Sequence, residues 1–507
     1  MDLAKNAAAI RGSFCIEEIP RQAGFVIFGA SGDLTSRKLI PALYNLHRKR
    51  LLPRGFFLIG CARSTFTDET FRAGMAEAIR AQAEPSSEAS LAGFLERCFY
   101  QEGDYLDPQL YAGLAQRLNE LDRRFLLEQN HVFYLATPPN LYRPVIEQLG
   151  SSGLSRETAG CANAVRIIIE KPFGRDLESA MDLDRALSAV FSERQIYRID
   201  HYLGKETVQN ILLLRFANAI FEPIWNRRYI DNVQITVAES VGIEHRAGYF
   251  EQAGLLRDMF QNHMLQMLAL VAMEPPCSFD ADRLRDEKVK LLRAIRPYDP
   301  DAVARFIVRG QYRGYLDEKG VAANSRVETF VAAKFLIDNW RWEGVPFYLR
   351  AGKRLKRKSS KIVISFKAVP HSMFLPLTPA DLAANILTFH VQPEEGISLR
   401  IQAKHPGPKL CMDALEMKFR YKEEIGVELP EAYERLLLDC LLGDQTLFIR
   451  HDDMQVSWSL ITPVLKAWQG DPEFAHTGKL MRYPAGSWGP ACSEELLGRD
   501  GMSWVRL

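Results

Sequence analysis

Short apolar runs alternate with amphipathic stretches over the first part of the chain. Such runs predict strands that are buried on both faces, and apolar residues at helical spacing predict the helices between them. The expected strands are Gly24–Phe28, Phe56–Ile59, His131–Ala136 and Val165–Ile169, with a helix over Leu39–Leu52. Strands that alternate with helices favour βαβ units, and we therefore expect a Rossmann-like, doubly wound parallel sheet of the α/β class.

The pattern changes near residue 200. Residues Asn232–Glu239 alternate between apolar and polar side chains with a period of two, which is typical of a half-buried strand. The same alternation recurs at Thr329–Leu336, Lys361–Phe366 and Ile397–Ala403, and helical stretches cover Leu255–Met273 and Tyr433–Leu442. We expect an N-terminal extension over residues 1–20, an α/β domain over 21–200, and a larger α+β domain with a mainly antiparallel sheet over 201–507.

The composition restricts the kinds of partner. Among 507 residues, 64 basic side chains nearly balance 63 acidic ones, so we expect no nucleic-acid partner. The 8 cysteines are scattered without a CxxC pair or a Cys/His cluster, which predicts neither a metal site nor disulfides and favours a cytoplasmic protein. No apolar run is long enough to span a bilayer, and residues 1–20 lack the apolar core of a signal peptide. We therefore expect no membrane association.

The densest group of functional side chains lies near the expected domain boundary. It consists of Asp200, His201, Tyr202, Lys205 and Glu206. An expected strand over Gln195–Ile199 precedes it and an expected helix begins at Thr207. A helix N-terminus presents unpaired N–H groups and partial positive charge, so it attracts anions. The cluster therefore predicts a phosphate-binding site; a capped helix with solvated charges is the alternative.

A glycine-containing turn follows the first expected strand. It consists of Gly29, Ala30, Ser31, Gly32, Asp33 and Leu34. Gly29 permits a tight turn, and Gly32 permits close approach of a pyrophosphate, which the N-terminus of the next helix attracts. Ser31 and Leu34 stand where the complete G-x-G-x-x-G fingerprint has glycines, so an ordinary tight turn is the alternative. We expect a dinucleotide cofactor at this turn.

The end of the second expected strand bears on the choice of cofactor. A site for NAD usually carries an acidic residue there, but this chain has Arg63 and Ser64. A guanidinium and a hydroxyl suit a 2′-phosphate, and Lys38 can supply a further cation. We therefore expect NADP rather than NAD; a solvated arginine at a strand end is the alternative.

Two further positions have side chains suited to catalysis. Lys171 lies just after a buried expected strand, and ligands of open α/β sheets bind beyond such carboxyl ends, so we expect it to contact substrate and cofactor. His263 lies in an otherwise apolar helix, where a histidine is usually a satisfied core residue. Its neighbours Asp258, Asn262 and Gln266 favour a general base instead. An imidazole titrates near neutral pH, and a partner carboxylate fixes its tautomer.

Six motifs together resemble those of the glucose-6-phosphate 1-dehydrogenase family. They are Gly29–Leu34, Glu170–Gly174, Arg198–Glu206, Arg257–His263, Leu429–Leu436 and Tyr483–Pro490. The similarity covers residues 24–490, and the Asp-His-Tyr-Leu-Gly-Lys-Glu motif is highly specific to this family. It implies an enzyme that oxidises C1 of glucose 6-phosphate to 6-phosphogluconolactone with NADP, the first step of the oxidative pentose phosphate pathway. A non-catalytic sensor of NADP or a sugar phosphate is the alternative.

The resemblance also implies roles for single residues. His263 is implied to accept the proton of the C1 hydroxyl, and Asp200 to support the charged imidazole. The residues implied to bind the substrate are Lys171, His201, Tyr202, Lys205, Glu239, Asp258, Lys353 and Lys358, with Arg357 as an alternative to Lys358. Family members are homodimers or homotetramers, and some hold a second, structural NADP; the sequence leaves both points open.

Overall fold

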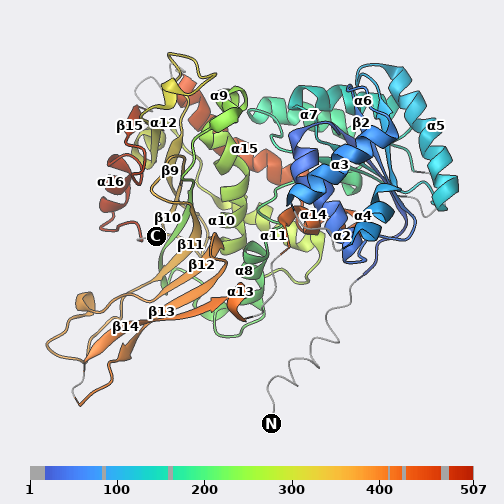
Figure 1. Ribbon diagram of the computed structural model, residues 1–507. Coiled ribbons are helices and arrows are strands. Elements are labelled where there is room, and N and C mark those ends of the chain that lie inside the picture. Colours follow the sequence, from blue (N-terminus) through green and yellow to red (C-terminus); the bar gives the residue numbers. More distant parts are fainter. Residues whose placement is uncertain are drawn as a thin grey trace, which may run out of the picture. The chain divides into compact units, whose positions relative to one another are not determined.

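The computed structural model describes residues 18–82, 87–157, 164–408, 411–424, 430–469 and 479–505. Most of the expected N-terminal extension (residues 1–17) and Leu429 of the fifth motif lie outside the described residues. The chain forms two compact units (Figure 1). The first runs up to Phe173 and adds Asp182–Ile199 and Glu431–Ile449; the second contains Gly174–Met181, Asp200–Pro430 and the residues from Arg450 onward.

A six-stranded parallel sheet forms the centre of the first unit. Its strands are β1 Ala23–Phe28, β2 Phe56–Ala62, β3 Cys98–Glu102, β4 His131–Leu135, β5 Val165–Ile169 and β6 Ile196–Arg198. They are arranged in the order β3-β2-β1-β4-β5-β6, with Val26 of β1 between Ile59 of β2 and Phe133 of β4. This is the order of the Rossmann fold, so the predicted doubly wound sheet is confirmed. The strands β1, β2 and β4 are buried along their whole length, as their apolar runs require.

Helices connect these strands. They are α2 Ile40–Arg48, α3 Asp68–Gln82, α4 Glu88–Leu95, α5 Pro108–Phe125, α6 Tyr142–Ser151 and α7 Leu177–Ser188. Helix α14 Ala432–Leu442, from far along the chain, belongs to the same unit without connecting two of these strands. A π-helical segment, Thr35–Leu39, precedes α2. The expected helix over Leu39–Leu52 ends early because Arg50 adopts a left-handed conformation with φ of 60°. Helix α5 begins with a capped N-terminus, since Asp107 accepts a hydrogen bond from the backbone of Gln109 and Pro108 occupies the first turn.

The second unit contains a nine-stranded sheet. Its strands are β7 Ile230–Ala238, β8 Ile307–Tyr312, β9 Phe330–Phe335, β10 Phe347–Gly352, β11 Ser359–Phe366, β12 Ile386–Gln392, β13 Gly396–Lys404, β14 Met412–Arg420 and β15 Leu480–Tyr483. The order is β14-β13-β12-β11-β7-β10-β9-β8-β15. Only the pairs β7–β10 and β8–β15 are parallel among these described strands, so the predicted mainly antiparallel sheet is confirmed.

Strand β7 differs from its prediction in burial. Its alternating pattern predicted one solvated face, but both faces are almost entirely buried. The C-terminal segment covers the polar face, where Gln234 donates to the Ser503 carbonyl at 3.0 Å and accepts from the Val505 amide at 2.8 Å. The guanidinium of Arg350, on the adjacent β10, lies 4.1 Å from the ring centroid of Trp504. Polar alternation thus marks hydrogen bonding to another segment here, not exposure to water.

The helices of the second unit include the segment that carries His263. They are α8 Glu206–Phe216, α9 Ala247–Leu255, α10 Leu265–Ala272, α11 Ala281–Ala294, α12 Pro300–Phe306, α13 Tyr421–Glu424, α15 His451–Gln469 and α16 Cys492–Gly498. The stretch Leu255–Met273, predicted as one helix, contains a π-helical segment (η6) at Leu256–Met264 between α9 and α10, which follow one another in Figure 1. Within the described ranges, none of the helices combines the length and apolar character that a membrane crossing requires.

Candidate functional site

A histidine–aspartate pair forms the centre of a polar cluster in the second unit. His263 on η6 and Asp200 at the start of the turn before α8 are both completely buried. The imidazole Nδ1 lies 2.5 Å from Asp200 Oδ1, and the same oxygen accepts a hydrogen bond from the Tyr202 amide at 2.9 Å. Because Nδ1 faces the carboxylate, the neutral tautomer with its proton on Nδ1 makes Nε2 the basic nitrogen. The pair therefore has the arrangement of an oriented general base.

The predicted phosphate-binding residues surround this imidazole. The ring of Tyr202 stacks on that of His263 at a centroid distance of 4.5 Å, and the His201 ring meets it edge-on at 4.6 Å. Lys205 occupies the N-cap position of α8, with its Nζ 3.7 Å from the Tyr202 ring centroid. An ammonium, a phenol and an imidazole thus gather beside the N-terminus of an 11-residue helix. This is the chemistry that a phosphate group prefers.

The polar neighbours of His263 along the helix form hydrogen bonds with partners other than its imidazole ring. The Asp258 carboxylate accepts from the Tyr249 hydroxyl at 3.0 Å, and the Asn262 side-chain oxygen accepts from the His263 backbone at 2.6 Å. The Gln266 amide donates to Asp453 on α15 at 2.8 Å. The partner carboxylate comes from Asp200, which is 63 positions away along the chain. The carboxylate that orients the ring is therefore that of Asp200, although Asp258 is nearer to His263 in the sequence.

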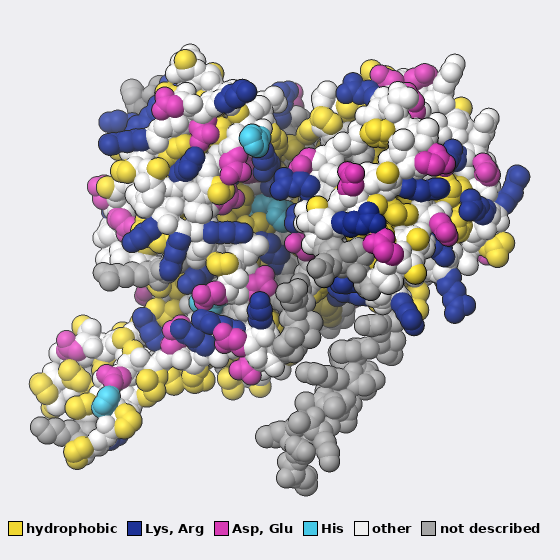
Figure 2. Space-filling model, in the orientation of Figure 1, with side chains coloured by type: hydrophobic (Ala, Val, Ile, Leu, Met, Phe, Trp, Pro, Cys, Tyr) yellow, Lys and Arg dark blue, Asp and Glu magenta, His cyan; other side chains and the backbone are white. Residues whose placement is uncertain are grey.

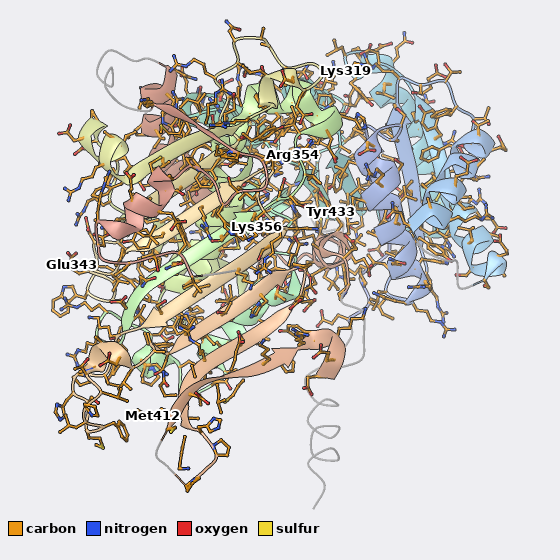
Figure 3. All side chains as sticks on the ribbon, turned by 60° about the vertical axis from the view of Figure 1, so that its left-hand side comes forward. Lys319, Glu343, Arg354, Lys356, Met412 and Tyr433 are labelled. Carbon is orange, nitrogen blue, oxygen red and sulfur yellow. The ribbon has the colours of Figure 1, made fainter. Side chains whose placement is uncertain are left out.

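Further charged side chains lie where β7 and β10 end. The Lys353 ammonium forms an ion pair with the Glu239 carboxylate, and its Nζ lies 5.3 Å from the ring centroid of Phe250. Lys358 and Arg357 are both exposed in the loop before β11, on which Figure 3 marks Arg354 and Lys356.

The Tyr202 hydroxyl stays a neutral donor. Burial and then the Glu239 carboxylate raise its pKa.

Three residues of the cluster also have the chemistry of metal ligands. Asp200, His201 and His263 each offer a ligand atom, and these atoms lie within 4.8 Å of one another. The short contact between His263 and Asp200 already explains two of the three groups as an acid–base pair. The expectation that this protein uses no metal stays a prediction.

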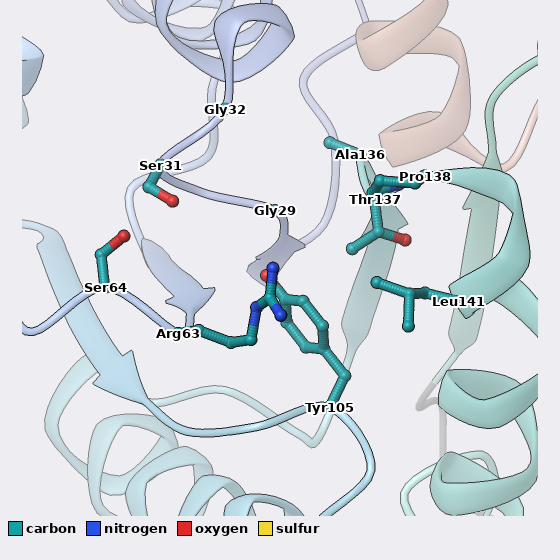
Figure 4. Close-up of a pocket in the computed structure, with 10 residues that line it drawn as sticks. All are labelled: Gly29, Ser31, Gly32, Arg63, Ser64, Tyr105, Ala136, Thr137, Pro138 and Leu141. Atoms are coloured by element: carbon teal, nitrogen blue, oxygen red, sulfur yellow. The ribbon is translucent and has the colours of Figure 1, made fainter. Parts of the chain in front are cut away.

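The first unit contains a pocket of about 360 Å³ beyond the carboxyl ends of β1, β2 and β4 (Figure 4). It is lined by Gly29, Ser31, Gly32, Arg63, Ser64, Tyr105, Ala136, Thr137, Pro138 and Leu141. Figure 4 shows the Arg63 and Tyr105 side chains next to each other, across the pocket from Thr137 and Leu141. Four of the predicted cofactor residues besides Arg63 therefore line one cavity: Gly29, Ser31, Gly32 and Ser64. Tyr105, which the sequence did not single out, joins them from the loop after β3.

The turn after β1 needs glycine for steric reasons. Gly29 has φ of +93°, and a Cβ atom at this position would lie 2.4 Å from the Ala136 carbonyl oxygen. Only glycine therefore fits here, because the turn passes close to the backbone that follows β4. Ala30 is buried behind the turn, Asp33 pairs with Arg37, and Leu34 precedes the π-helical segment. Lys38 lies farther along, where its ammonium is 3.0 Å from the Glu431 carboxylate.

A buried carboxyl group lies next to Lys171. The Glu170 side chain accepts hydrogen bonds from the hydroxyls of Tyr134 at 2.6 Å and Tyr433 at 2.9 Å, and Tyr142 donates to its backbone carbonyl at 3.0 Å. Tyr433 lies on α14 and is labelled in Figure 3. Burial raises the pKa of the Glu170 carboxyl. Three tyrosines thus hold Glu170, two at its side chain and one at its backbone, directly before the half-buried Lys171. The sequence motif alone did not reveal this arrangement.

The fold and the site together define a class. The chain combines a Rossmann sheet, a glycine turn with an open pocket, and a buried histidine–aspartate pair. These features together define a nicotinamide-dependent dehydrogenase. Comparison with known families makes this specific. The model of the glucose-6-phosphate dehydrogenase NAD binding domain matches residues 26–210, and that of the C-terminal domain matches residues 212–505. The chain belongs to the glucose-6-phosphate dehydrogenase family.

Similar proteins agree with this assignment. The glucose-6-phosphate 1-dehydrogenase of Aggregatibacter actinomycetemcomitans is 46% identical over 95% of this chain and 97% of its own length. The enzyme of the same name from Bacillus subtilis is 42% identical over 96% and 99%. A solved glucose-6-phosphate dehydrogenase in complex with its substrate glucose-6-phosphate superposes with a TM-score of 0.87 at 37% identity, covering 96% of this chain and 99% of that one.

Proposed function

We propose that this protein oxidises C1 of D-glucose 6-phosphate to 6-phospho-D-glucono-1,5-lactone with NADP as the hydride acceptor, the first step of the oxidative pentose phosphate pathway. The single observation that carries the proposal is the buried His263–Asp200 pair beside His201, Tyr202 and Lys205. The same unit thus holds a base for the sugar and cations for its phosphate. Membership of the family supports the choice of substrate.

The proposed chemistry follows from the orientation of the imidazole. His263 Nε2 accepts the proton of the C1 hydroxyl, while Asp200 holds Nδ1 and stabilises the imidazolium that forms. A bound nicotinamide supplies the hydride acceptor at its C4 position. Loss of the proton and the hydride from the sugar turns its C1–OH carbon into the lactone carbonyl. Lys205 and its neighbours bind the phosphate and so hold C1 at a fixed distance from the base.

The remaining substrate contacts are proposed from the resemblance and from burial. Glu239 and Asp258 are assigned to sugar hydroxyls, because carboxylates accept hydrogen bonds from such groups. Lys353 is held by Glu239 and is assigned to the substrate as well. Of the exposed pair Lys358 and Arg357, Lys358 remains our choice, and Lys171 of the first unit is assigned to both substrate and cofactor.

A direct assay tests the proposal. The protein is mixed with glucose 6-phosphate and NADP, and NADPH absorbance is followed, with unphosphorylated glucose as the comparison substrate. We expect His263→Asn to lower kcat by roughly 10²- to 10⁴-fold with little change in KM. The matched control is His405→Asn, because His405 also pairs with an aspartate, Asp413, at 2.5 Å but lies on the surface. Full activity of His263→Asn removes the base assignment.

The same assay addresses the alternative function. A non-catalytic sensor of NADP or sugar phosphate binds both ligands without forming NADPH. The completeness of the His263–Asp200 pair favours the enzyme, because a sensor has no need of an oriented base. Ligand binding by calorimetry without any absorbance change would instead establish the sensor.

Preference for NADP is proposed from Arg63. This exposed guanidinium lines the pocket of the first unit together with Ser64. Among the residues that the structure describes, no acidic side chain lines this pocket to hold a ribose 2′-hydroxyl. We expect NADP to be preferred, and Arg63→Ala to raise KM for NADP about tenfold or more while KM for NAD changes little. Equal effects on both cofactors would remove Arg63 from contact with a 2′-phosphate.

A homodimer or homotetramer is proposed from the outer face of the large sheet. Strand β14 forms one edge of this sheet, and its exposed side chains Leu415, Met417 and Phe419 alternate with charged ones. Figure 2 shows hydrophobic side chains gathered on the projecting part that contains β13 and β14. An apolar face of this kind is suited to pairing with the same face of a second copy.

A cytoplasmic location is proposed as well. The 6 cysteines within the described ranges are unbridged, which supports it.

A further inference from the structure

Three buried polar side chains form a network one helical turn from His263. Gln266 lies on α10, Asp453 on α15 and Lys288 on α11, and none has more than 1% of its surface exposed. Gln266 Nε2 donates to Asp453 Oδ1 at 2.8 Å, and Lys288 Nζ lies 3.1 Å from Asp453 Oδ2. The Ser457 hydroxyl, one turn along α15, also donates to Asp453 Oδ1 at 3.3 Å. All four residues belong to the second unit.

Such a network is costly compared with apolar packing. A buried lysine and aspartate lose their hydration, and their mutual attraction does not fully offset that loss. Apolar side chains of similar size fill a helix interface without this cost. The network instead restricts how the helices pack. A hydrogen bond fixes the relative position of two helices, whereas leucine and methionine contacts leave several positions open.

The backbone around His263 needs such a restriction, because it is not a regular α-helix. Residues Leu256–Met264 form a π-helix, and the regular α-helix Leu265–Ala272 begins two residues after His263. Wide helical turns of this kind are uncommon and occur at functional sites. A shift of one residue along a helix rotates each side chain by about 100°. Such a shift would carry the imidazole away from Asp200 Oδ1, which lies 2.5 Å from it.

The apolar side chains of this helix do not select one register by themselves, so the register depends on polar contacts such as that of Asp258 with Tyr249 before His263 and that of Gln266 with Asp453 after it. Met259, Met264, Met267 and Leu268 are all buried beside His263, and flexible methionines fill irregular space in more than one way. Gln266 is the first residue after the π-to-α transition whose side chain makes a hydrogen bond to another helix. Its amide therefore holds the helix directly after the transition, on the C-terminal side of His263.

We infer that Lys288, Asp453 and Gln266 are positioning residues that hold η6 and α10 in the register in which His263 pairs with Asp200. Lys288 keeps the Asp453 carboxylate in one orientation, Asp453 holds the Gln266 amide, and Gln266 fixes the helical turn next to the base. The inference rests on the proposed dehydrogenase function and adds to it three residues that touch neither substrate nor cofactor.

Gln266→Leu tests the inference, because it removes the hydrogen bond and leaves the ion pair of Lys288 with Asp453. We expect kcat to fall about tenfold or more, since small misplacements of a catalytic group have effects of this size. KM for glucose 6-phosphate should change less than about twofold, because the phosphate-binding residues precede α8 and lie outside the network. The acid limb of the kcat–pH profile should move to lower pH, because a weaker Asp200 contact makes the imidazolium less favourable.

Two further variants separate positioning from stability. Gln234→Leu is the matched control, since Gln234 is also buried in the second unit but bonds to Ser503 and Val505; it should lower the melting temperature and leave kcat and the pH profile unchanged. Lys288→Met removes the cation that orients the Asp453 carboxylate, and should lower kcat in the same direction as Gln266→Leu with KM for glucose 6-phosphate little changed; an unchanged kcat would remove Lys288 from the positioning role. A wild-type kcat and pH profile in Gln266→Leu, or an equal loss of kcat in Gln234→Leu, would overturn the inference.

A readout without substrate distinguishes failure of the inference from failure of the proposed function. The His263 Nδ1 proton, hydrogen-bonded to Asp200, should give a far-downfield proton NMR signal in the wild type and in Gln234→Leu. This signal should shift or vanish in Gln266→Leu. An unchanged signal there refutes the positioning role, whereas absence of NADPH formation by the wild type refutes only the dehydrogenase proposal.

Discussion

At the scale of single residues, two buried carboxyl groups are given different behaviour by the groups that touch them. Asp200 faces an imidazole that can carry a charge and also accepts the Tyr202 amide, so its surroundings suit a carboxylate that supports a cation. Glu170 accepts hydrogen bonds from two neutral phenols, and burial raises its pKa. The sequence showed both acids beside site residues but could not show these partners, because Tyr433 lies 263 positions away from Glu170.

The surroundings of Glu170 predict how stability depends on pH. The folded protein holds the Glu170 proton more tightly than the unfolded chain, for which the reference pKa is 4.5. As pH rises above that value, the unfolded chain loses the proton first, so the stability contributed by this group falls until the higher folded pKa is passed. Glu170→Gln removes the titration and keeps an oxygen acceptor for both tyrosines.

Thermal unfolding at a series of pH values checks this expectation. Relative to the wild type, Glu170→Gln should gain stability as the pH is raised from about 4 to about 8. The exposed Asn119 on α5 provides the control, because Asn119→Ser changes no titratable group and should differ from the wild type by the same amount at every pH. A pH-independent difference for Glu170→Gln would show that the native environment does not favour the protonated acid.

At the scale of elements, most helices and strands follow their local patterns, and the exceptions lie where another segment intervenes. The alternation in β7 predicted exposure, but the C-terminal segment covers its polar face. The apolar periodicity of Leu255–Met273 predicted a helix but could not predict its π-helical part, since a register change of the backbone leaves little trace in an apolar pattern. The turn at Gly29 was predicted for its small size, and the structure shows the carbonyl that demands it.

Substitution at Gly29 should therefore be far more costly than at an ordinary glycine. Gly29→Ala puts a Cβ 2.4 Å from the Ala136 oxygen at a positive φ, and we expect a loss of about 2–4 kcal/mol in the free energy of unfolding. Gly93→Ala is the control, because Gly93 lies inside α4 and no atom lies within 4 Å of an added Cβ. It should stabilise the protein by about 0.5–1 kcal/mol. Urea unfolding measures both; similar values for the two variants would contradict the steric argument.

At the scale of the whole molecule, the edge of the large sheet is the surface that we propose for association of copies. Leu415, Met417 and Phe419 of β14 are 53%, 56% and 38% exposed, and the next strand, β13, places Ile401, Leu399 and Ile397 opposite them. The side chains of these two strands thus form a continuous apolar face. Figure 3 labels Met412, where β14 begins at the outer end of this pair of strands.

Charges on this face should separate the copies. We expect the double variant Leu415→Lys/Met417→Lys to sediment as a monomer while the wild type sediments as a dimer or tetramer, because like charges would be buried against each other at a two-fold interface. Glu416→Gln changes the intervening residue of β14, which points to the opposite face, and should leave the oligomer intact. Sedimentation velocity at several concentrations measures the difference, and an oligomeric double variant would place the interface elsewhere.

The sequence by itself determined the parallel sheet, the antiparallel sheet and the family, because apolar periodicity and short motifs are local properties of the chain. It also placed most candidate side chains next to the right strand or helix end. The family resemblance already implied that Asp200 supports His263. The tertiary structure decided the other contacts: Glu239 with Lys353, Arg63 beside Tyr105, and Gln266 with Asp453. Such contacts join residues that are distant along the chain, and they arise from packing of whole elements, which no local pattern encodes.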